Sequence, residues 1–267
     1  MTVLLSRLLP PGPAVSAHAH VEALEWPVPE DRPYVVVNLV ASIDGRVTLD
    51  GRSVALSDPA DRALFHALRE RADAVLAGTA TLAREPYGRM LRAPAARERR
   101  VAAGRPAEPL LVTVSRDGSA LPDAEVFGCA HARAVVFSPR PPAATIPVAA
   151  HVQHEPLAPD APGALTQMLG ALRARHDVRL LLCEGGPVLF GLLLSAGLVD
   201  ELLLTVAPVV AGGCGPRASP ALDGGARAEL RGVLASGDTL FLRYRFSSAG
   251  GASSVPAHRR ESESDRG

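Results

Sequence analysis

The sequence predicts an α/β domain with a mostly parallel central sheet, flanked by helices and closed by an antiparallel hairpin at its C-terminal edge. Residues 180–208 run from an apolar stretch into Glu184-Gly185-Gly186, then through an apolar helix to a second apolar stretch. A strand, a turn, a helix and a strand in this order form a crossover between parallel strands. Near the C-terminus, the stretches 229–234 and 239–246 flank Gly237-Asp238, which is typical of a hairpin turn.

The elements upstream of this crossover alternate between strand and helix. The first strand is rich in β-branched residues, and Asp58 ahead of Pro59 is typical of a helix start. Between residues 84 and 109 the sequence is rich in Arg, Ala and Pro and has little periodicity, and we expect its second half to be mobile. We predict strands at 34–40, 74–77, 110–114, 134–137 and 178–183, and helices over 59–69 and 164–175.

Length and composition indicate one folded domain. With 267 residues, of which 47% are apolar, the chain can bury a full core. We predict that the domain spans residues 33–246. Residues 1–32, rich in Pro and His, are expected to form an irregular leader packed on it. Residues 247–267, rich in Ser, Gly, Arg and Glu, are expected to be a disordered tail.

Residue usage argues against several classes of function. The 28 basic residues balance the 28 acidic ones, which gives no support for nucleic-acid or membrane-surface binding. Lysine is absent, so a P-loop lysine, a Schiff-base lysine and a pyridoxal phosphate anchor are impossible. Arginine offers planar, bidentate recognition of phosphate and carboxylate, although codon bias also explains such a replacement.

No metal site and no activated nucleophile are predicted. His20-Val21-Glu22 matches the first half of a zinc deaminase signature, but its second half, Pro-Cys-x-x-Cys, is missing. His151 and His154 lie in a loop-like stretch without nearby cysteines, and no Gly-x-Ser-x-Gly occurs. The three cysteines are too scattered for a disulfide framework. The N-terminus lacks the features of a signal peptide and no run has membrane-spanning length, so a cytoplasmic protein is expected.

The turn at residues 184–186 predicts two half-sites. Gly185 and Gly186 allow backbone N–H groups to approach a ligand, and the helix N-terminus behind them attracts an anion such as a dinucleotide pyrophosphate. The Glu184 carboxylate would repel phosphate unless it faces a different ligand. A tight turn whose glycines serve packing alone is the alternative. The pattern differs from the Gly-x-Gly-x-x-Gly of a Rossmann fold.

Five motifs follow one another along the chain. They are Ala41-Ser-Ile-Asp-Gly-Arg46, Leu68-Arg69 ahead of Ala72-Asp73-Ala74, Gly78-Thr-Ala-Thr81, Glu184-Gly-Gly-Pro187, and Gly197-Leu-Val-Asp-Glu201 with Pro208 and Gly212 beyond it. Together they resemble the reductase domain of riboflavin biosynthesis, usually the C-terminal half of a bifunctional deaminase-reductase. The resemblance covers about residues 33–246 and implies a dihydrofolate reductase-like fold. Because Pro-Cys-x-x-Cys is missing, the deaminase half is not expected here.

The resemblance implies an NADPH-dependent oxidoreductase with a small-molecule substrate. Its expected reaction is hydride transfer to 5-amino-6-(5-phosphoribosylamino)uracil, which opens the ribose to a ribityl chain. The implied cofactor contacts are Val40, Ala55, Ser57, Thr81, Glu85, Ser115, Arg116, Gly185, Gly186, Pro187, Val188, Leu189, Phe190, Gly191 and Leu192.

Four of these cofactor contacts need comment. Thr81 is expected to donate its hydroxyl to a phosphate, and a helix cap is the alternative. Ser115 and Arg116 resemble a contact with the ribose 2′-phosphate, which would select NADPH over NADH; an ordinary Ser-Arg-Asp-Gly turn is the alternative. Glu85 stands where the family usually has the first aspartate of Asp-Asp-Pro.

The resemblance also implies the substrate contacts Ser53, Arg69, Arg89, Arg92 and Glu184. Arg89 and Arg92 are expected to grip the 5′-phosphate, with solvated arginines as the alternative. Glu184 is expected to accept hydrogen bonds from pyrimidine N–H groups or to orient the ribose. If Arg69, Arg92 and Glu184 do not converge, the enzyme hypothesis fails.

Two aspartates, and two positions where this sequence differs from the family's usual residues, complete the prediction. Asp44, with Glu184, is a candidate catalytic residue near the reacting ribose, and an Asx turn is its alternative. Asp200 is expected to be structural. Neither aspartate is assigned as the general acid, since water can supply the proton. Arg46 replaces a lysine common in the family, and Tyr87 with its neighbouring arginines indicates a reshaped pocket.

These departures leave other functions open. One alternative is a reductase of another heterocycle, such as dihydrofolate, and a second is a non-catalytic NADP-binding protein. The resemblance further implies a homodimer. We expect its interface at the sheet edge formed by residues 229–246, because an exposed edge needs a partner or a cover.

Overall fold

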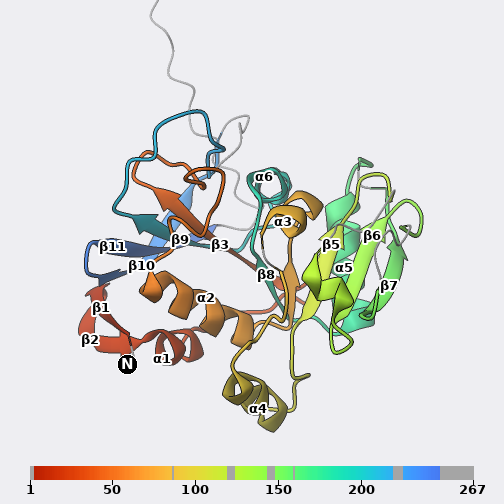
Figure 1. The fold of residues 1–267 in the computed structure, drawn as a ribbon, viewed down its shortest axis with the longest axis horizontal. Coiled ribbons are helices and arrows are strands. Elements are labelled where there is room, and N and C mark those ends of the chain that lie inside the picture. The colour runs from red at the N-terminus through yellow and green to blue at the C-terminus, as the bar shows by residue number, and fades with distance from the viewer. Residues whose placement is uncertain are drawn as a thin grey trace, which may run out of the picture.

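One sheet runs through the whole molecule (Figure 1). This computed structural model describes residues 3–85, 87–118, 124–142, 148–158, 160–218 and 225–246. Within them, the strands lie in the order β2-β1-β10-β11-β9-β3-β8-β4-β5-β6-β7. From β9 to β7 neighbouring strands are parallel, and from β9 to β2 they are antiparallel.

The strands of the parallel half are mostly short and apolar. They are β3 (Tyr34–Ser42), β4 (Ala74–Leu76), β5 (Leu110–Val114), β6 (Arg133–Ser138), β7 (His151–Pro156), β8 (Leu180–Cys183) and β9 (Glu201–Ala207). The strands of the antiparallel half are β1 (Leu4–Leu9), β2 (Pro11–Ser16), β10 (Ala228–Ser236) and β11 (Thr239–Phe246).

Helices cover both faces of the sheet, as parallel strands require. They are α1 (Ala17–Glu22), α2 (Pro59–Arg71), α3 (Thr79–Arg84), α4 (Pro94–Ala102), α5 (Ala164–His176) and α6 (Pro187–Ser195), with a 3₁₀ turn at Glu125–Gly128. Successive side chains of β3 point to opposite faces. Val36 therefore packs in the core beneath α1 and α2, whereas Val35 and Val37 pack beneath α5 and α6.

The predicted fold class is confirmed. The crossover is present as β8, α6 and β9, and the predicted hairpin is present as β10 and β11. Its place at the edge is wrong, because β1 pairs with β10 and β2 lies outermost. No helix in the described part of the chain is long and apolar enough to span a bilayer.

Three further regions correct the sequence prediction. Residues 4–22 of the expected irregular leader form β1, β2 and α1, and the Ser16 hydroxyl caps α1 by accepting from Ala19 N. The stretch at 84–109, whose second half the sequence predicts to be mobile, contains α4, which extends into that half. The histidines of the expected loop at 151–154 belong to β7. The predicted tail at 247–267 lies outside the described residues, so the domain boundaries remain predictions.

Candidate functional site

Two glycine turns lie side by side where β4 and β8 end. Gly78 N donates to the Gly185 carbonyl at 3.1 Å, and Gly186 N donates to Thr81 Oγ1 at 3.0 Å. Gly185 has φ +94°, and its peptide bond to Gly186 is cis. A Cβ on Gly186 would lie 3.1 Å from Thr81 Oγ1, so the close approach of the two turns favours glycine there. Ligands of α/β sheets bind at such carboxyl ends of strands.

The N-terminus of α6 is open to a ligand. Gly186 is the N-cap and Pro187 begins the helix, so no side chain caps the first N–H groups of α6. Val188 is 66% exposed and Leu192 is 52% exposed, whereas Leu189, Phe190 and Gly191 are buried. Of the predicted cofactor residues on this helix, Val188 and Leu192 thus face solvent, whereas the three buried ones pack in the core.

The position of Thr81 decides between its two predicted roles. It lies in the first turn of α3, whose N-cap is Gly78, so Thr81 is not the cap. Because its hydroxyl oxygen accepts from Gly186 N, the hydroxyl hydrogen remains to donate to another group.

Glu184 belongs to a buried network with α2. Arg69 Nε and Nη2 donate to the two Glu184 carboxylate oxygens at 2.6 and 2.7 Å. The Tyr87 hydroxyl donates to Glu184 Oε2 at 2.6 Å. The Glu184 side chain is 3% exposed and that of Arg69 is 10% exposed. Burial would lower the pKa of Arg69, but the Glu184 charge beside it raises that pKa, so Arg69 stays charged.

This network ties three segments together. Arg69 stands at the end of α2, Tyr87 follows α3, and Glu184 precedes the glycine turn. Arg69 Nη1 also donates to the Met90 carbonyl at 3.3 Å, and the Arg69 guanidinium lies 4.2 Å from the Phe65 ring centroid. Since both Glu184 oxygens already accept protein donors, the geometry supports a positioning role for Glu184. Its contact with substrate remains a prediction.

Arg92 lies in the same neighbourhood. The Arg92 residue is exposed. His66, which lies one turn ahead of Arg69 on α2, is exposed as well. Partial burial, and then the charges of Arg69 and Arg92, lower the pKa of His66, while Glu184 acts in the opposite sense. Arg69 and Glu184 are thus in direct contact, and the charge of Arg92 acts on His66 beside them; the convergence of all three in one cleft remains a prediction. The sequence offered a signal for His66, since it stands three residues before Arg69.

Arg89 is less available than Arg92. Its Nε lies 3.4 Å from Glu108 Oε1, and Glu108 also faces His131 at 3.6 Å and accepts from Met90 N. A phosphate at Arg89 would have to share this arginine with Glu108.

Asp44 joins two loops rather than standing free. Its Oδ1 accepts from the Ser42 hydroxyl at 2.7 Å and from Ala211 N at 2.8 Å, and its Oδ2 accepts from Gly212 N at 2.9 Å. These bonds, the one from Ser42 foremost, lower the pKa of Asp44 to about 2. The geometry supports the local structural alternative for Asp44.

Arg46 serves the same pair of loops. Its guanidinium donates to the Gly215 carbonyl at 2.5 Å and to the Gly213 carbonyl at 2.6 Å. A lysine at this position would have one ammonium group for these two acceptors, whereas arginine reaches both.

The remaining predicted residues line the loop between β3 and α2 or the turn after β5. Ser53 N and Oγ donate to Glu85 Oε1 at 3.2 and 2.7 Å, so a predicted substrate residue bonds a predicted cofactor residue. The Ser57 hydroxyl donates to buried Asp61. Val40 is half-buried at the end of β3, and Ala55 is exposed.

Ser115 and Arg116 behave differently from each other. Ser115 is buried, and its hydroxyl accepts from Gly118 N at 3.1 Å, as in an ordinary turn. Arg116 is 78% exposed and lies 3.8 Å from Asp160. Arg116 is therefore free to meet an anion, while Ser115 shapes the turn.

The family of this chain follows from comparison with known proteins. The model of the RibD C-terminal domain matches residues 33–241. The chain belongs to the RibD C-terminal domain family. The matched residues include both glycine turns and the Arg69–Glu184 pair.

Individual relatives agree with membership in the RibD C-terminal domain family. A 2,5-diamino-6-ribosylamino-4(3H)-pyrimidinone 5′-phosphate reductase of Archaeoglobus fulgidus is 29% identical over 68% of this chain and 83% of its own length. The riboflavin biosynthesis protein RibD of Mycobacterium tuberculosis is 35% identical over 68% of this chain, but the match spans only 44% of that protein. A solved structure of a pyrimidine reductase-like protein from Corynebacterium diphtheriae has a TM-score of 0.72, with 25% identity over 87% of this chain and 99% of the other.

Proposed function

We propose that this chain is an NADPH-dependent reductase of riboflavin biosynthesis that acts on a pyrimidine ribosylamine 5′-phosphate. The observation that carries the proposal is the adjacency of the two half-sites in a member of the RibD C-terminal domain family. The open N-terminus of α6 adjoins Thr81 through the bond from Gly186 N. Glu184, which is paired with Arg69, directly precedes Gly185 of the same turn. An anion-binding turn beside a cluster of arginines suits a dinucleotide and a sugar phosphate.

The residues present fit a nicotinamide dinucleotide. The N–H groups of α6 and the Thr81 hydroxyl would hold the pyrophosphate, and the close packing of Gly186 on Thr81 leaves the backbone accessible there. Exposed Arg116 would contact the 2′-phosphate that distinguishes NADPH from NADH. When bound, NADPH would supply a hydride to the ribose carbon that carries the amino group.

The other residues bind and orient the substrate. Exposed Arg92 would grip the 5′-phosphate, with Arg89 as a second donor shared with Glu108. Buried Glu184 and Arg69 would fix the wall against which the pyrimidine lies. Ser53, bonded to Glu85, would hold the loop between the two half-sites.

The direct test measures NADPH oxidation with four compounds side by side. These are 5-amino-6-(5-phosphoribosylamino)uracil, the 2,5-diamino-pyrimidinone analogue, the dephosphorylated uracil compound and dihydrofolate. We expect turnover with a phosphorylated pyrimidine and none with dihydrofolate. Tight NADPH binding without turnover of any compound would favour a non-catalytic NADP-binding protein instead.

An arginine variant sharpens this experiment. Arg92→Gln should raise KM for the phosphorylated substrate by about tenfold or more, because a charge-assisted hydrogen bond is worth about 1.5–3 kcal/mol. It should leave the kinetics of the dephosphorylated compound unchanged. Arg175→Gln on α5, an exposed arginine paired with Glu155, is the matched control.

We also propose that the protein forms a homodimer. The predicted edge is covered by β1 and β2, but one face of β9 and β11 carries Val206, Leu240 and Tyr244, which are only partly buried. Leu240 is 38% exposed. Apolar side chains in a contiguous, incompletely covered row favour a second copy of the chain. Light scattering in solution should give the mass of two chains, and a monomeric mass would refute the proposal.

A further inference from the structure

A cavity separate from the candidate site lies under the antiparallel half of the sheet; we call it the second cavity. Its volume is about 310 Å³. It is enclosed by α1, the β1–β2 hairpin, α2 and strands β9 to β11. The hairpin and α1 lie at the end of the molecule where β10 and β11 are found (Figure 1). None of the residues predicted to contact cofactor or substrate lines this cavity.

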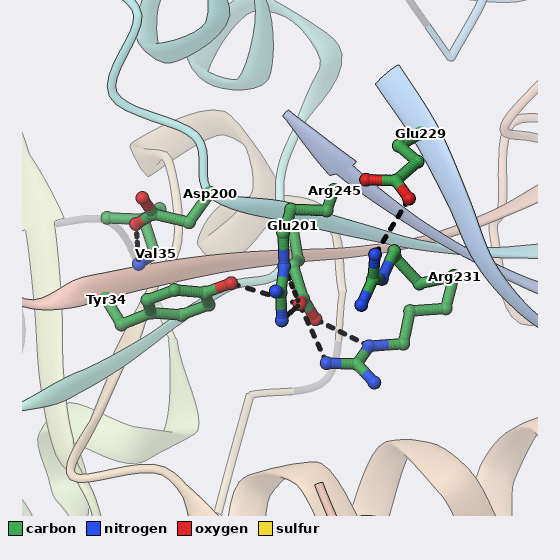
Figure 2. A network of polar contacts seen from close by, with 8 residues as sticks. Tyr34, Val35, Asp200, Glu201, Glu229, Arg231 and Arg245 are labelled. Carbon is green, nitrogen blue, oxygen red and sulfur yellow. Dashed lines mark hydrogen bonds and ion pairs between the residues drawn. The ribbon is translucent and has the colours of Figure 1, made fainter. Parts of the chain in front are cut away.

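The cavity wall carries excess positive charge. Arg7, Arg231 and Arg243 line the cavity, and no acidic side chain does. Arg231 pairs with Glu229 at 2.8 Å (Figure 2), and Arg243 gives its Nε and Nη2 to Glu201.

One arginine of the wall has no ion pair within the residues that the structure describes, and a second keeps one nitrogen free although it is paired with Glu201. Arg7 makes no hydrogen bond or ion pair with another residue in the described part of the chain, and Arg243 keeps its Nη1 free of such bonds. His20 is neutral near pH 7, because burial first, and then the charges of Arg243 and Arg7, lower its pKa to about 4. The polar end of the cavity therefore carries the unpaired charge of Arg7 and the free Nη1 of Arg243.

The rest of the wall is apolar. Leu64 of α2, Leu234 of β10 and Phe241 of β11 line it. Small-molecule sites are typically apolar pockets of about 300–1,000 Å³ with a few convergent polar groups. This cavity therefore suits a ligand with one charged head and a short hydrocarbon body.

We propose that the cavity is a binding site for a small organic carboxylate with an apolar chain. The carboxylate lies between Arg7 and Arg243, and the chain lies against Leu64 and Phe241. Arginine is suited to this task because its planar donors match a carboxylate. Burial of the chain against apolar walls adds about 25 cal/mol per Å² removed from water.

The site is separate from the candidate active site yet linked to it by hydrogen bonds. Thr205 lines the cavity and donates its hydroxyl to Asp61 at 2.6 Å. Asp61 in turn accepts from Ser57, a predicted cofactor contact. Since none of the predicted cofactor contacts lines the cavity, the carboxylate and NADPH should bind at the same time.

The test is a calorimetric titration of the full chain with octanoate at neutral pH, with and without saturating NADPH. We expect one site per chain with a Kd of about 1 mM or tighter, which corresponds to about 4 kcal/mol for this ten-atom ligand. NADPH should leave this Kd unchanged. Octanamide, which has the same chain without the charge, should bind at least tenfold more weakly.

Two variants locate the site. Arg7→Gln removes a guanidinium that makes no hydrogen bond or ion pair in the described part of the chain. The variant should therefore fold normally and bind octanoate about tenfold or more weakly. Ala19→Trp fills the cavity from α1 and should abolish binding. Arg175→Gln, remote from the cavity, should change nothing. No binding of octanoate, equal binding of octanamide, displacement by NADPH or full affinity in Arg7→Gln would each overturn the proposal.

Discussion

Glu184 and Glu201 are two buried carboxylates with closely similar partners. Glu184 accepts from Arg69 and Tyr87, and its side chain is 3% exposed. Glu201 accepts from Arg243, Arg245 and Tyr34 and has no exposed surface. Figure 2 shows the Tyr34 hydroxyl and the Arg245 guanidinium directed at Glu201. Arginine and tyrosine thus surround a glutamate both at the end of β8 and at the boundary where β9 pairs with antiparallel β11.

The difference between the two networks lies in the backbone beside them. Glu184 follows the last residue of β8 and leads into the glycine turn and the open end of α6. Glu201 is the first residue of β9, and strands surround it on both sides. A buried ion pair alone is weak evidence of function, because its desolvation and its Coulomb attraction nearly cancel. Of the two networks, only that of Glu184 lies at the carboxyl end of a strand beside the glycine turn, whereas the Glu201 network shares Arg243 with the wall of the cavity under the antiparallel strands.

The largest effect should come from breaking the Glu184 network. Glu184→Ala leaves Arg69 buried without a counter-charge and should reduce stability by about 3–5 kcal/mol. It should also reduce kcat/KM at least a hundredfold, because the turn and the arginines lose their common anchor. Urea unfolding and NADPH oxidation measure the two losses.

Tyr87→Phe is the matched control for this network. It removes one hydroxyl but keeps the ion pair, so it should cost only about 1 kcal/mol. Full turnover in folded Glu184→Ala would show that the network does not position the site. Equal loss of turnover and of NADPH affinity would place Glu184 in the cofactor half-site instead.

The next effect distinguishes the Glu201 network from the Glu184 network. Glu201→Ala leaves Arg243 and Arg245 unpaired and should reduce stability by about 3–5 kcal/mol, as Glu184→Ala does. The protein that remains folded should keep its kcat within about threefold, since Glu201 touches neither half-site. A loss of kcat as large as in Glu184→Ala would erase the distinction between the two networks.

The contrast between these networks also explains what could be predicted from the sequence. The turn at 184–186 was predictable because its glycines and the flanking apolar runs are local signals. The Glu201 network was not, since Tyr34 lies 167 residues away in sequence and its arginines depend on the pairing of β11 with β9. The bond between Arg69 and Glu184 spans 115 residues, and the resemblance predicted only that the two share a cleft.

Two other elements escaped prediction for physical reasons. The segment Pro11–Ser16 contains two prolines and no apolar alternation, yet it forms β2 because β1 supplies its partner and β10 supplies a partner to β1. The segment His151–Pro156 is largely polar because β7 is an edge strand with little burial. In both cases tertiary pairing determines the strand more than local propensity does.

The smallest effect concerns a histidine in each half. His20 lies near Arg243, and its pKa of about 4 in the folded protein is below the usual histidine value of 6.5. The proton therefore binds more tightly to the unfolded chain, and the stability that neutral His20 contributes is complete above pH 6.5 and is lost as the pH falls towards 4. Relative to His20→Gln, the wild type should lose about 2–3 kcal/mol between pH 7 and pH 4.5.

His66 is the matched comparison in the parallel half. It is exposed beside Arg69 and Arg92, and its pKa is also lowered. Because solvent screens its charge, His66→Gln should change the pH dependence less than His20→Gln does. Urea unfolding of the three proteins at pH 7 and pH 4.5 measures the difference. If the wild type and His20→Gln lost stability in parallel, His20 would not be held neutral by burial and by the arginines around the second cavity, and the positive charge inferred for that cavity would lose its support.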